Sequence, residues 1–244
     1  MENKINIFLP GLDNQIRFVR RKLDLEGKTT LTLGSTSEEI VKIFAKETNQ
    51  KAELIVEDYN SLLNSRLLLG NDKRFNVRLM DYEFTDFKDN SFDLVYTQGG
   101  ISNPRRAKIV KELKRILKPE GILCVGEVVS LREDIPPFVQ DIYDSSELEP
   151  LQATQIEKYY IERNFEVIDQ KDLSFTLEEY YTKNLFELKK TVKELAENEK
   201  SYYKKLINMI SHEAKAFLKE GASDYIGFYS LILKKKVELL NSSN

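Results

Sequence analysis

An apolar run closes on two acids in the segment Leu54-Ile55-Val56-Glu57-Asp58. The run predicts a strand, and a carboxylate at a strand end accepts hydrogen bonds from both hydroxyls of a ribose. Glu57 is the first candidate for this role and Asp58 is its competitor. The apolar positions of the following predicted helix, Leu62 and Leu63, favour Glu57. A solvated acid at a strand end stays open as the alternative explanation.

A glycine ends an earlier apolar run, in the sequence Leu33-Gly34-Ser35-Thr36. A glycine at a strand end lets the backbone approach a ligand closely, and a helix that starts next offers free N–H groups to a carboxylate. Ser35 and Thr36 are also candidate N-caps, each with a glutamate three residues later. The loop therefore predicts an anion-binding turn, with a plain strand-to-helix turn as the alternative.

Two further polar pairs follow apolar runs, Asp81-Tyr82 and Gln98-Gly99. Ligands of open parallel sheets bind outside the carboxyl ends of the strands. Both pairs are expected at that edge, beside Gly34 and Glu57. Asp93 precedes its strand instead of following it, so we interpret it as structural.

Short strands alternate with amphipathic helices along the first part of the chain, which predicts a parallel α/β sheet with right-handed crossovers. The predicted strands are 29–33, 52–56, 75–80, 92–96, 122–129, 165–168 and 225–233. The predicted helices are 14–24, 35 to about 47, 61–69, 103–117 and 152–163, and the segment around Ile135-Pro136-Pro137 is predicted to be a loop.

Residues 176–220 differ from the rest, because they are charged and amphipathic with no strand among them. Tyr181, Leu185 and Leu188 alternate steps of four and three, which predicts a helical apolar face. We expect a single domain over 1–244 in which 176–220 form a helical insertion that covers the ligand edge of the sheet. A plain packing face is the alternative.

The composition limits the partners. The chain of 244 residues holds 37 basic and 40 acidic residues, a net charge of −3, so we expect no nucleic acid and no membrane as partner. One cysteine and one histidine leave almost no soft ligands, so we expect no metal. No apolar stretch approaches the roughly 20 residues of a membrane span, and no signal peptide is evident, so we expect a cytoplasmic protein. A homo-oligomer stays an open alternative.

The order of these motifs resembles that of class I S-adenosylmethionine-dependent methyltransferases, and of their ubiquinone-biosynthesis-like small-molecule subgroup in particular. The resemblance also includes the Leu9-Pro10-Gly11 loop, the run 117–121, Glu127 after the fifth long strand and the closing motif 223–228. It implies a doubly wound, Rossmann-like seven-stranded sheet with an antiparallel last strand and a helical insertion before it.

The resemblance further implies S-adenosylmethionine as cofactor and methyl transfer to a small-molecule substrate. The cofactor-binding residues that it implies are Gly34, Ser35, Thr36, Glu57, Asp58, Asp81, Tyr82, Gln98 and Gly99. In such a site the acid after the third strand takes the adenine amino group, and the next backbone N–H meets the ring. The candidates for a catalytic base are Glu127, Tyr180 and Tyr181.

Three positions depart from the family pattern. Thr32 replaces an acid that orients the methionine amino group, at a cost of about 1.5–3 kcal/mol for the lost charge-assisted hydrogen bond. Thr36 and Glu38 replace glycines and are expected to crowd the methionine carboxylate. For Glu38 the alternative is that it caps the helix and points to water. A methyltransferase-like protein that has lost or changed its cofactor site, and acts as a binding or partner protein, is therefore the alternative function.

Overall fold

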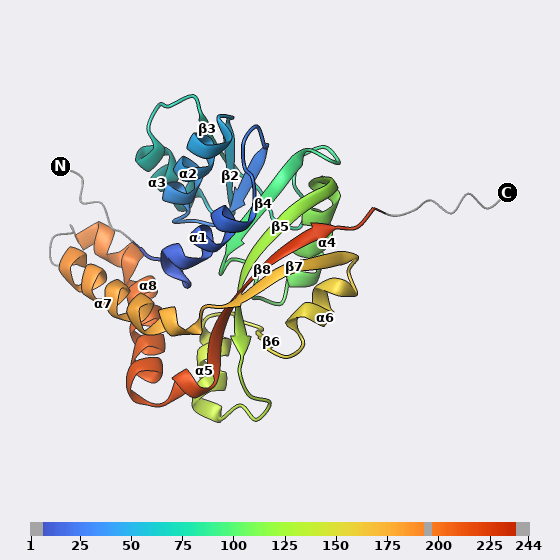
Figure 1. The fold of residues 1–244 in the computed structure, drawn as a ribbon. Coiled ribbons are helices and arrows are strands. Elements are labelled where there is room, and N and C mark those ends of the chain that lie inside the picture. The colour runs from blue at the N-terminus through green and yellow to red at the C-terminus, as the bar shows by residue number, and fades with distance from the viewer. Residues whose placement is uncertain (1–6, 193–196, 238–244) are drawn as a thin grey trace.

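The computed structural model describes residues 7–192 and 197–237 (Figure 1). Within these ranges, side chains are described for residues 7–190 and 207–237. The strands are β1 (Thr30–Leu33), β2 (Ala52–Val56), β3 (Phe75–Leu79), β4 (Phe92–Gln98), β5 (Leu117–Ser130), β6 (Leu151–Gln152), β7 (Phe165–Asp172) and β8 (Ile226–Lys235). Within the described residues they form one sheet in the order β3-β2-β1-β4-β5-β8-β7, and the two-residue β6 pairs with β5 beside this path. All pairs are parallel except those of β8, which runs antiparallel to β5 and β7.

Helices cover both faces of this sheet (Figure 1). The helices are α1 (Leu12–Lys22), α2 (Glu38–Thr48), α3 (Tyr59–Leu69), α4 (Arg106–Ile116), α5 (Pro137–Ser145), α6 (Ile156–Ile161), α7 (Leu177–Val192) and α8 (Glu197–Lys219). Because neighbouring strand residues point to opposite faces, Tyr96 packs against Phe44 of α2, whereas Val95 joins the core that α4 and α6 close. None of the helices in the described ranges is long and apolar enough to cross a bilayer.

The helices α7 and α8 lie between β7 and β8 in the chain and pack with α5 at one edge of the sheet (Figure 1). Their shared core contains Tyr143 of α5, Tyr181 of α7 and Phe217 of α8, together with Phe228 near the start of β8. Since β8 is antiparallel to β5 and β7, its start lies at the carboxyl ends of those strands. We call this helical layer, α7 with α8, the cap. Residues 193–196 of the predicted insertion lie outside the described part of the chain.

The predicted doubly wound sheet with an antiparallel last strand is confirmed, but several boundaries differ. The predicted proline loop is confirmed at Ile135 and Pro136, but α5 begins already at Pro137, where the missing N–H of a proline in the first turn costs nothing. The strand predicted from 122 begins at Leu117, directly after α4. The helix predicted over 152–163 is shorter, because Gln152 pairs in β6 and α6 begins at Ile156.

Asp93 ties three strands together at their amino ends. Its Oδ2 accepts hydrogen bonds from the Thr29 backbone N–H at 2.9 Å, the Thr29 hydroxyl at 2.7 Å and Lys118 Nζ at 2.7 Å. Partial burial acts to raise its pKa, but the hydrogen bonds from Lys118 and Thr29 prevail and lower the pKa to about 2. The structural interpretation of Asp93 is therefore confirmed by its partners.

We expect Asp93→Asn to lower the free energy of unfolding by about 2 kcal/mol at neutral pH, because the carboxylate pKa falls on folding. This stabilisation is complete above the unfolded pKa of about 4 and is lost as the pH falls towards about 2. Urea unfolding of both proteins across this pH range measures the difference. Asp89→Asn, at an exposed ion pair with Arg115, is the control. A difference that does not change with pH would contradict the assignment.

Candidate functional site

The loop after β1 and the acid after β2 lie side by side. Leu33 pairs with Ile55 in the parallel register, and the Gly34 backbone N–H donates to the Ile55 carbonyl at 3.1 Å. Glu57 follows two residues later, at the same edge. The parallel sheet therefore brings together the two motifs that the sequence predicted to share a site.

The altered loop keeps a glycine-type backbone in spite of its side chains. Gly34 has φ 117°, and Thr36 has φ 65°, in the left-handed region that glycine prefers. The helix α2 then starts at Glu38 with Ser37 as N-cap, so the prediction of Ser35 or Thr36 as N-cap is wrong. Thr36 holds the turn where the family has a glycine, at the cost of local strain.

Glu38 does not face the loop. It is buried, and its Oε1 accepts a hydrogen bond from the Ser65 hydroxyl of α3 at 2.5 Å. Neither expectation for Glu38 describes this arrangement, in which its carboxylate is directed at α3 and not at water.

Two hydroxyls near the loop are buried without a partner among the described residues, those of Thr32 and Ser37. Ser37 Oγ lies 3.6 Å from the point where a Cβ on Gly34 would stand, and apart from residues 33–35 no other described atom lies within 4 Å of that point. Buried polar atoms are normally paired, so a polar ligand group at Gly34 would meet an available hydroxyl. The loop residues fit the carboxylate or amine of an amino acid.

Glu57 reaches from the end of β2 to the residues after β3. Its Oε1 accepts from the Tyr82 backbone N–H at 2.9 Å, the group expected at an adenine ring. Arg105 donates to both carboxylate oxygens, from Nη2 to Oε1 at 2.8 Å and from Nη1 to Oε2 at 2.9 Å. Arg105 Nη2 also donates to Asp81 Oδ1 at 2.5 Å. The acids predicted for ribose and adenine therefore share one guanidinium, which the sequence reasoning missed.

Asp58 has a different task. It is the N-cap of α3, and its Oδ1 accepts from the Ser61 backbone N–H at 2.9 Å. Capping of this kind is worth about 1 kcal/mol to a helix. Of the two competing acids, Glu57 is the one that the fold turns towards the loop edge.

Gln98 is buried and holds the N-terminal segment. Its Nε2 donates to the carbonyls of Pro10 and Leu12 at 2.8 and 2.9 Å, and its Oε1 accepts from the Tyr96 hydroxyl at 2.5 Å. Gly99, with φ 75°, leaves room for Pro10, whose Cγ would lie 2.8 Å from an added Cβ. Gln98 and Gly99, which were predicted to bind the cofactor, thus contact the Leu9-Pro10-Gly11 loop. The sequence did not predict this packing of the loop against the end of β4.

The same N-terminal segment is attached to the cap. The Asn184 side chain of α7 accepts from the Phe8 backbone N–H at 2.9 Å and donates to the Phe8 carbonyl at 3.1 Å. Asn184 is fully buried, so both groups of Phe8 depend on it. Residues 8–10 thus connect the cap to the end of β4.

Glu127, a predicted catalytic base, is fully buried in an ion-pair network. Its Oε2 accepts from Arg106 Nε at 2.7 Å and from the Ser102 hydroxyl at 3.2 Å, and its Oε1 accepts from the Tyr160 hydroxyl. Both carboxylate oxygens are therefore hydrogen-bonded to other residues of the protein. Removing a proton from a substrate would require this network to break.

Tyr180 and Tyr181, the other predicted catalytic residues, lie in the cap. Their rings meet edge to face at 4.8 Å, and the Tyr181 hydroxyl donates to Glu213 Oε2 at 3.3 Å. Ser146 donates to the other oxygen of Glu213 at 2.5 Å. Burial raises the pKa of Glu213 and of both tyrosines. Tyr181 is therefore part of the cap core with its hydroxyl bound to Glu213, and Tyr180 packs against that core.

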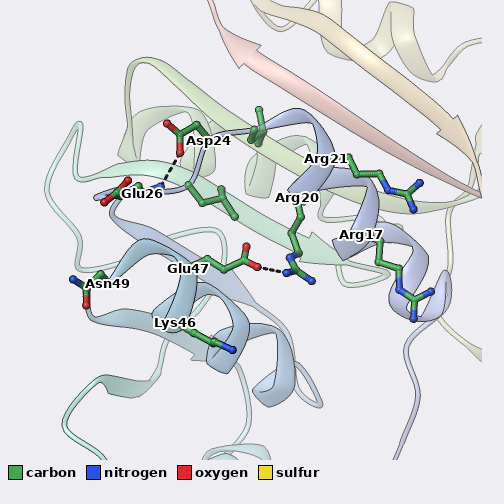
Figure 2. A pocket seen from close by; sticks show the side chains of 10 residues that line it. Arg17, Arg20, Arg21, Asp24, Glu26, Lys46, Glu47 and Asn49 are labelled. Atoms are coloured by element: carbon green, nitrogen blue, oxygen red, sulfur yellow. Dashed lines mark hydrogen bonds and ion pairs between the residues drawn. The ribbon is translucent and has the colours of Figure 1, made fainter.

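A surface hollow lies at the other end of the sheet. Figure 2 shows it between α1 and the end of α2, lined by Arg17, Arg20, Arg21, Asp24, Glu26, Lys46, Glu47 and Asn49 among others. These residues precede β1 and β2, so the hollow is at the amino ends of the strands. Its cations are partly neutralised, as by the ion pair between Arg20 and Glu47. Within the described residues no group of His, Cys, Asp or Glu is arranged to hold a metal ion.

Comparison with known proteins gives the domain a class. Residues 31–125 match the family model of the methyltransferase domain. The chain is 29% identical over 126 residues to the ubiquinone/menaquinone biosynthesis C-methyltransferase UbiE of Hydrogenovibrio crunogenus, a match that covers 48% of each protein. The match thus spans about half the length of this curated relative.

Solved structures share the fold at low identity. The phosphoethanolamine N-methyltransferase 2 of Haemonchus contortus, in complex with S-adenosyl-L-methionine, has a TM-score of 0.76 at 16% identity, over 95% of this chain and 54% of that chain. The [4+2]-cyclase SpnF has a TM-score of 0.72 at 20% identity, over 97% and 86% of the two chains. These likenesses show the fold alone, since one architecture hosts different reactions.

The domain match, the strand order and the antiparallel last strand define a class I methyltransferase fold. The chain therefore contains a domain of the methyltransferase family, and over about half its length it is distantly related to the UbiE methyltransferases.

Thr36→Gly tests the strained loop. We expect it to raise the free energy of unfolding by about 0.5–1 kcal/mol, because relief of a left-handed threonine exceeds the entropy cost of glycine. Thr36→Ala, which keeps a Cβ, is the matched control and should gain nothing. Urea unfolding measures both, and a destabilised glycine variant would show that the Thr36 side chain makes a contact the loop needs.

Proposed function

We propose that the chain binds S-adenosylmethionine at the carboxyl edge of β1, β2 and β3 and transfers its methyl group to a small-molecule acceptor. The observation that supports this most directly is the juxtaposition of the Gly34 loop and Glu57, held by the hydrogen bond from Gly34 to Ile55 at 3.1 Å. The family of the matched domain uses the same cofactor.

In this proposal each end of the cofactor has its own protein groups. The Gly34 turn, the Ser37 hydroxyl and the start of α2 receive the amino acid end, since a helix N-terminus favours a carboxylate. Glu57 receives the ribose hydroxyls, and Asp81 with the residues after it receives the adenine. When bound, the cofactor supplies a methyl group already activated on a sulfonium.

We infer the acceptor chemistry from the three predicted bases. Glu127 and the Tyr181 hydroxyl are hydrogen-bonded to other residues, and burial raises the pKa of Tyr180. Transfer to a sulfur or an amine requires positioning and loss of water more than proton removal. We therefore favour such an acceptor over an oxygen or carbon acceptor, which would need a base. Tyr180 and Tyr181 would act by shaping a water-poor wall for the acceptor.

A second function is favoured by one specific observation. Arg105 occupies both oxygens of Glu57, and Thr32 replaces the acid that helps to hold the amino acid end. A protein of this fold that has lost the cofactor and serves as a binding partner would show these features as well.

Calorimetric titration with S-adenosylmethionine and with adenosylhomocysteine separates these functions. We expect Glu57→Ala to weaken adenosylhomocysteine binding by at least about tenfold, because two ribose hydroxyls lose a charged acceptor. Asp58→Ala is the matched control: it should lower helix stability by about 1 kcal/mol and leave the affinity unchanged. Absence of binding to the wild-type protein would favour the second function. Equal affinity of a folded Glu57→Ala variant would remove Glu57 from the site.

We further propose that the cap, within the predicted insertion 176–220, covers the acceptor side of the site. Its connection to the strand ends runs through Asn184, Phe8 and Pro10, and its core adjoins the ends of β5 and β7. Removing the whole insertion would expose that shared core, so a point variant is the cleaner test.

Asn184→Ala should lower the free energy of unfolding by about 1–3 kcal/mol, because it leaves the N–H and the carbonyl of Phe8 without partners. Amide hydrogen exchange should rise at residues 8–12 while adenosylhomocysteine affinity stays unchanged, since the nucleoside groups are on other loops. Asn184→Asp keeps the acceptor for the Phe8 N–H but places a fully buried carboxylate against the Phe8 carbonyl, so it should lower stability at least as much at neutral pH and less at a pH where the carboxyl is protonated. Unchanged exchange in Asn184→Ala would separate the cap from the N-terminal segment.

A further inference from the structure

Arg105 binds carboxylates from three positions in the chain at once. Beside the two hydrogen bonds to Glu57 and the one to Asp81, its Nε donates to Glu83 Oε1 at 2.5 Å. The hydrogen bonds to Glu57 and Glu83 raise the pKa of Arg105, so the group stays a cation. One guanidinium therefore holds the end of β2 to the turn that follows β3.

The position of Arg105 conflicts with a local rule. It is the N-cap of α4 and Arg106 is the first helical residue, so two cations stand where the helix dipole favours acids. Arg106 is compensated in the interior by Glu127 at 2.7 Å. Arg105 is compensated by the acids of the candidate cofactor site. A local conflict of this kind is expected where a residue serves a site.

The contact uses the same atoms that a ribose would use. A bidentate arginine–carboxylate pair occupies both oxygens of the acid, and two ribose hydroxyls need those oxygens as acceptors. The pairing geometry of Arg105 with Glu57, at 2.8 and 2.9 Å, is of this bidentate kind. The Tyr82 N–H and the two N–H groups of Arg105 already take three of the roughly four lone-pair positions of Glu57, so the carboxylate cannot also accept from two ribose hydroxyls unless Arg105 moves.

The exposure of the partners shows which bonds can exchange. The side chains of Arg105, Glu57 and Asp81 are 39%, 31% and 54% exposed, whereas Glu83 is 9% exposed. Exposed ion pairs are weak and salt-sensitive, so the contacts to Glu57 and Asp81 can be given up. Glu83, which also pairs with Lys108 at 3.1 Å, can retain the arginine meanwhile.

We propose that Arg105 is a gate on the nucleoside site: it holds Glu57 and Asp81 in the free protein and is displaced towards Glu83 when an adenine nucleoside binds. This inference rests on the proposed function and deepens it, because it names the residue that sets cofactor affinity. Part of the binding free energy is used to break the contacts of Arg105, so the observed affinity is lower than it would be for a site that is already open.

If Arg105 acts as a gate, the affinity for the nucleoside ligand should depend on salt concentration. Salt weakens the exposed contacts of Arg105 with Glu57 and Asp81, so the affinity for adenosylhomocysteine, which carries no net charge, should rise with ionic strength. A variant without the arginine has nothing to release, so its affinity should be higher and less dependent on salt.

The experiment is calorimetric titration of adenosylhomocysteine into the full chain at low and high salt, with wild type, Arg105→Ala and Arg115→Ala. Arg115 is the matched control, because it lies in the same helix, is 35% exposed and pairs with Glu112 and Asp89 away from Glu57. We expect Arg105→Ala to bind about fivefold more tightly than wild type at low salt. Arg115→Ala should match wild type.

Arg105→Lys is a second variant in case the three acids destabilise Arg105→Ala. A lysine can keep Glu83 but cannot form the bidentate pair, so its affinity should also exceed that of wild type. Tighter binding by either variant, including binding by a variant where wild type shows none, supports the gate. Wild-type binding with equal or weaker binding by both variants overturns the gate and leaves the proposed function standing. No binding by any of the proteins overturns both.

Discussion

The buried carboxylate of Glu127 is the constraint on which the ligand edge of this molecule depends. It has no exposed surface, so it must be neutralised and hydrogen-bonded within the protein. Arg106 supplies the charge at 2.7 Å, and the hydroxyls of Ser102 and Tyr160 supply further donors. These partners come from α4, α6 and the turn after β4, which are thereby fixed to β5. Because Arg106 is drawn inward, its neighbour Arg105 is left on the side of Glu57. The core ion pair and the proposed gate are thus two results of one local arrangement.

The loop after β1 shows that a backbone can be kept while its usual residues are lost. Thr36 adopts φ 65° at a position where the family has glycine, and Glu38 turns into the interior to meet Ser65. Substitutions that looked damaging in sequence are therefore absorbed by strain in one case and by a new buried hydrogen bond in the other. The change at Thr32 is different in kind, since its hydroxyl is buried and unpaired among the described residues. It is the departure for which the fold offers no replacement.

Periodicity was sufficient to predict the sheet, because a strand buried on both faces leaves an unbroken apolar run such as 122–129. The positions of Gly34, Glu57 and Asp81 followed from the rule that parallel strands end at one edge. What could not be predicted depends on contacts distant in sequence. Arg105 meets Glu57 across 48 positions and Asn184 meets Phe8 across 176, and neither pair shares a local pattern. Two arginines at a helix start were a visible anomaly, and a search for residues that violate helix-dipole preference would have identified them.

The shared fold of N-methyltransferases and a [4+2]-cyclase shows that the sheet alone does not decide the reaction. Under the function proposed here, the deciding feature is whether a nucleoside can reach Glu57. Glu57 and Asp81, the acids proposed to bind the nucleoside, are the same acids that Arg105 holds in the free protein. The contacts of Arg105 with these two acids are exposed to solvent and are therefore its weakest. The pairing of Arg105 with Glu57 fits both functions proposed above, because a gated site and a site that has lost its ligand would each leave these acids paired in the free protein. The other two acids near the loop have structural partners: Asp58 accepts from the Ser61 N–H and Glu38 from the Ser65 hydroxyl. Among these three acids, Glu57 is the one whose partner is an arginine with exposed surface.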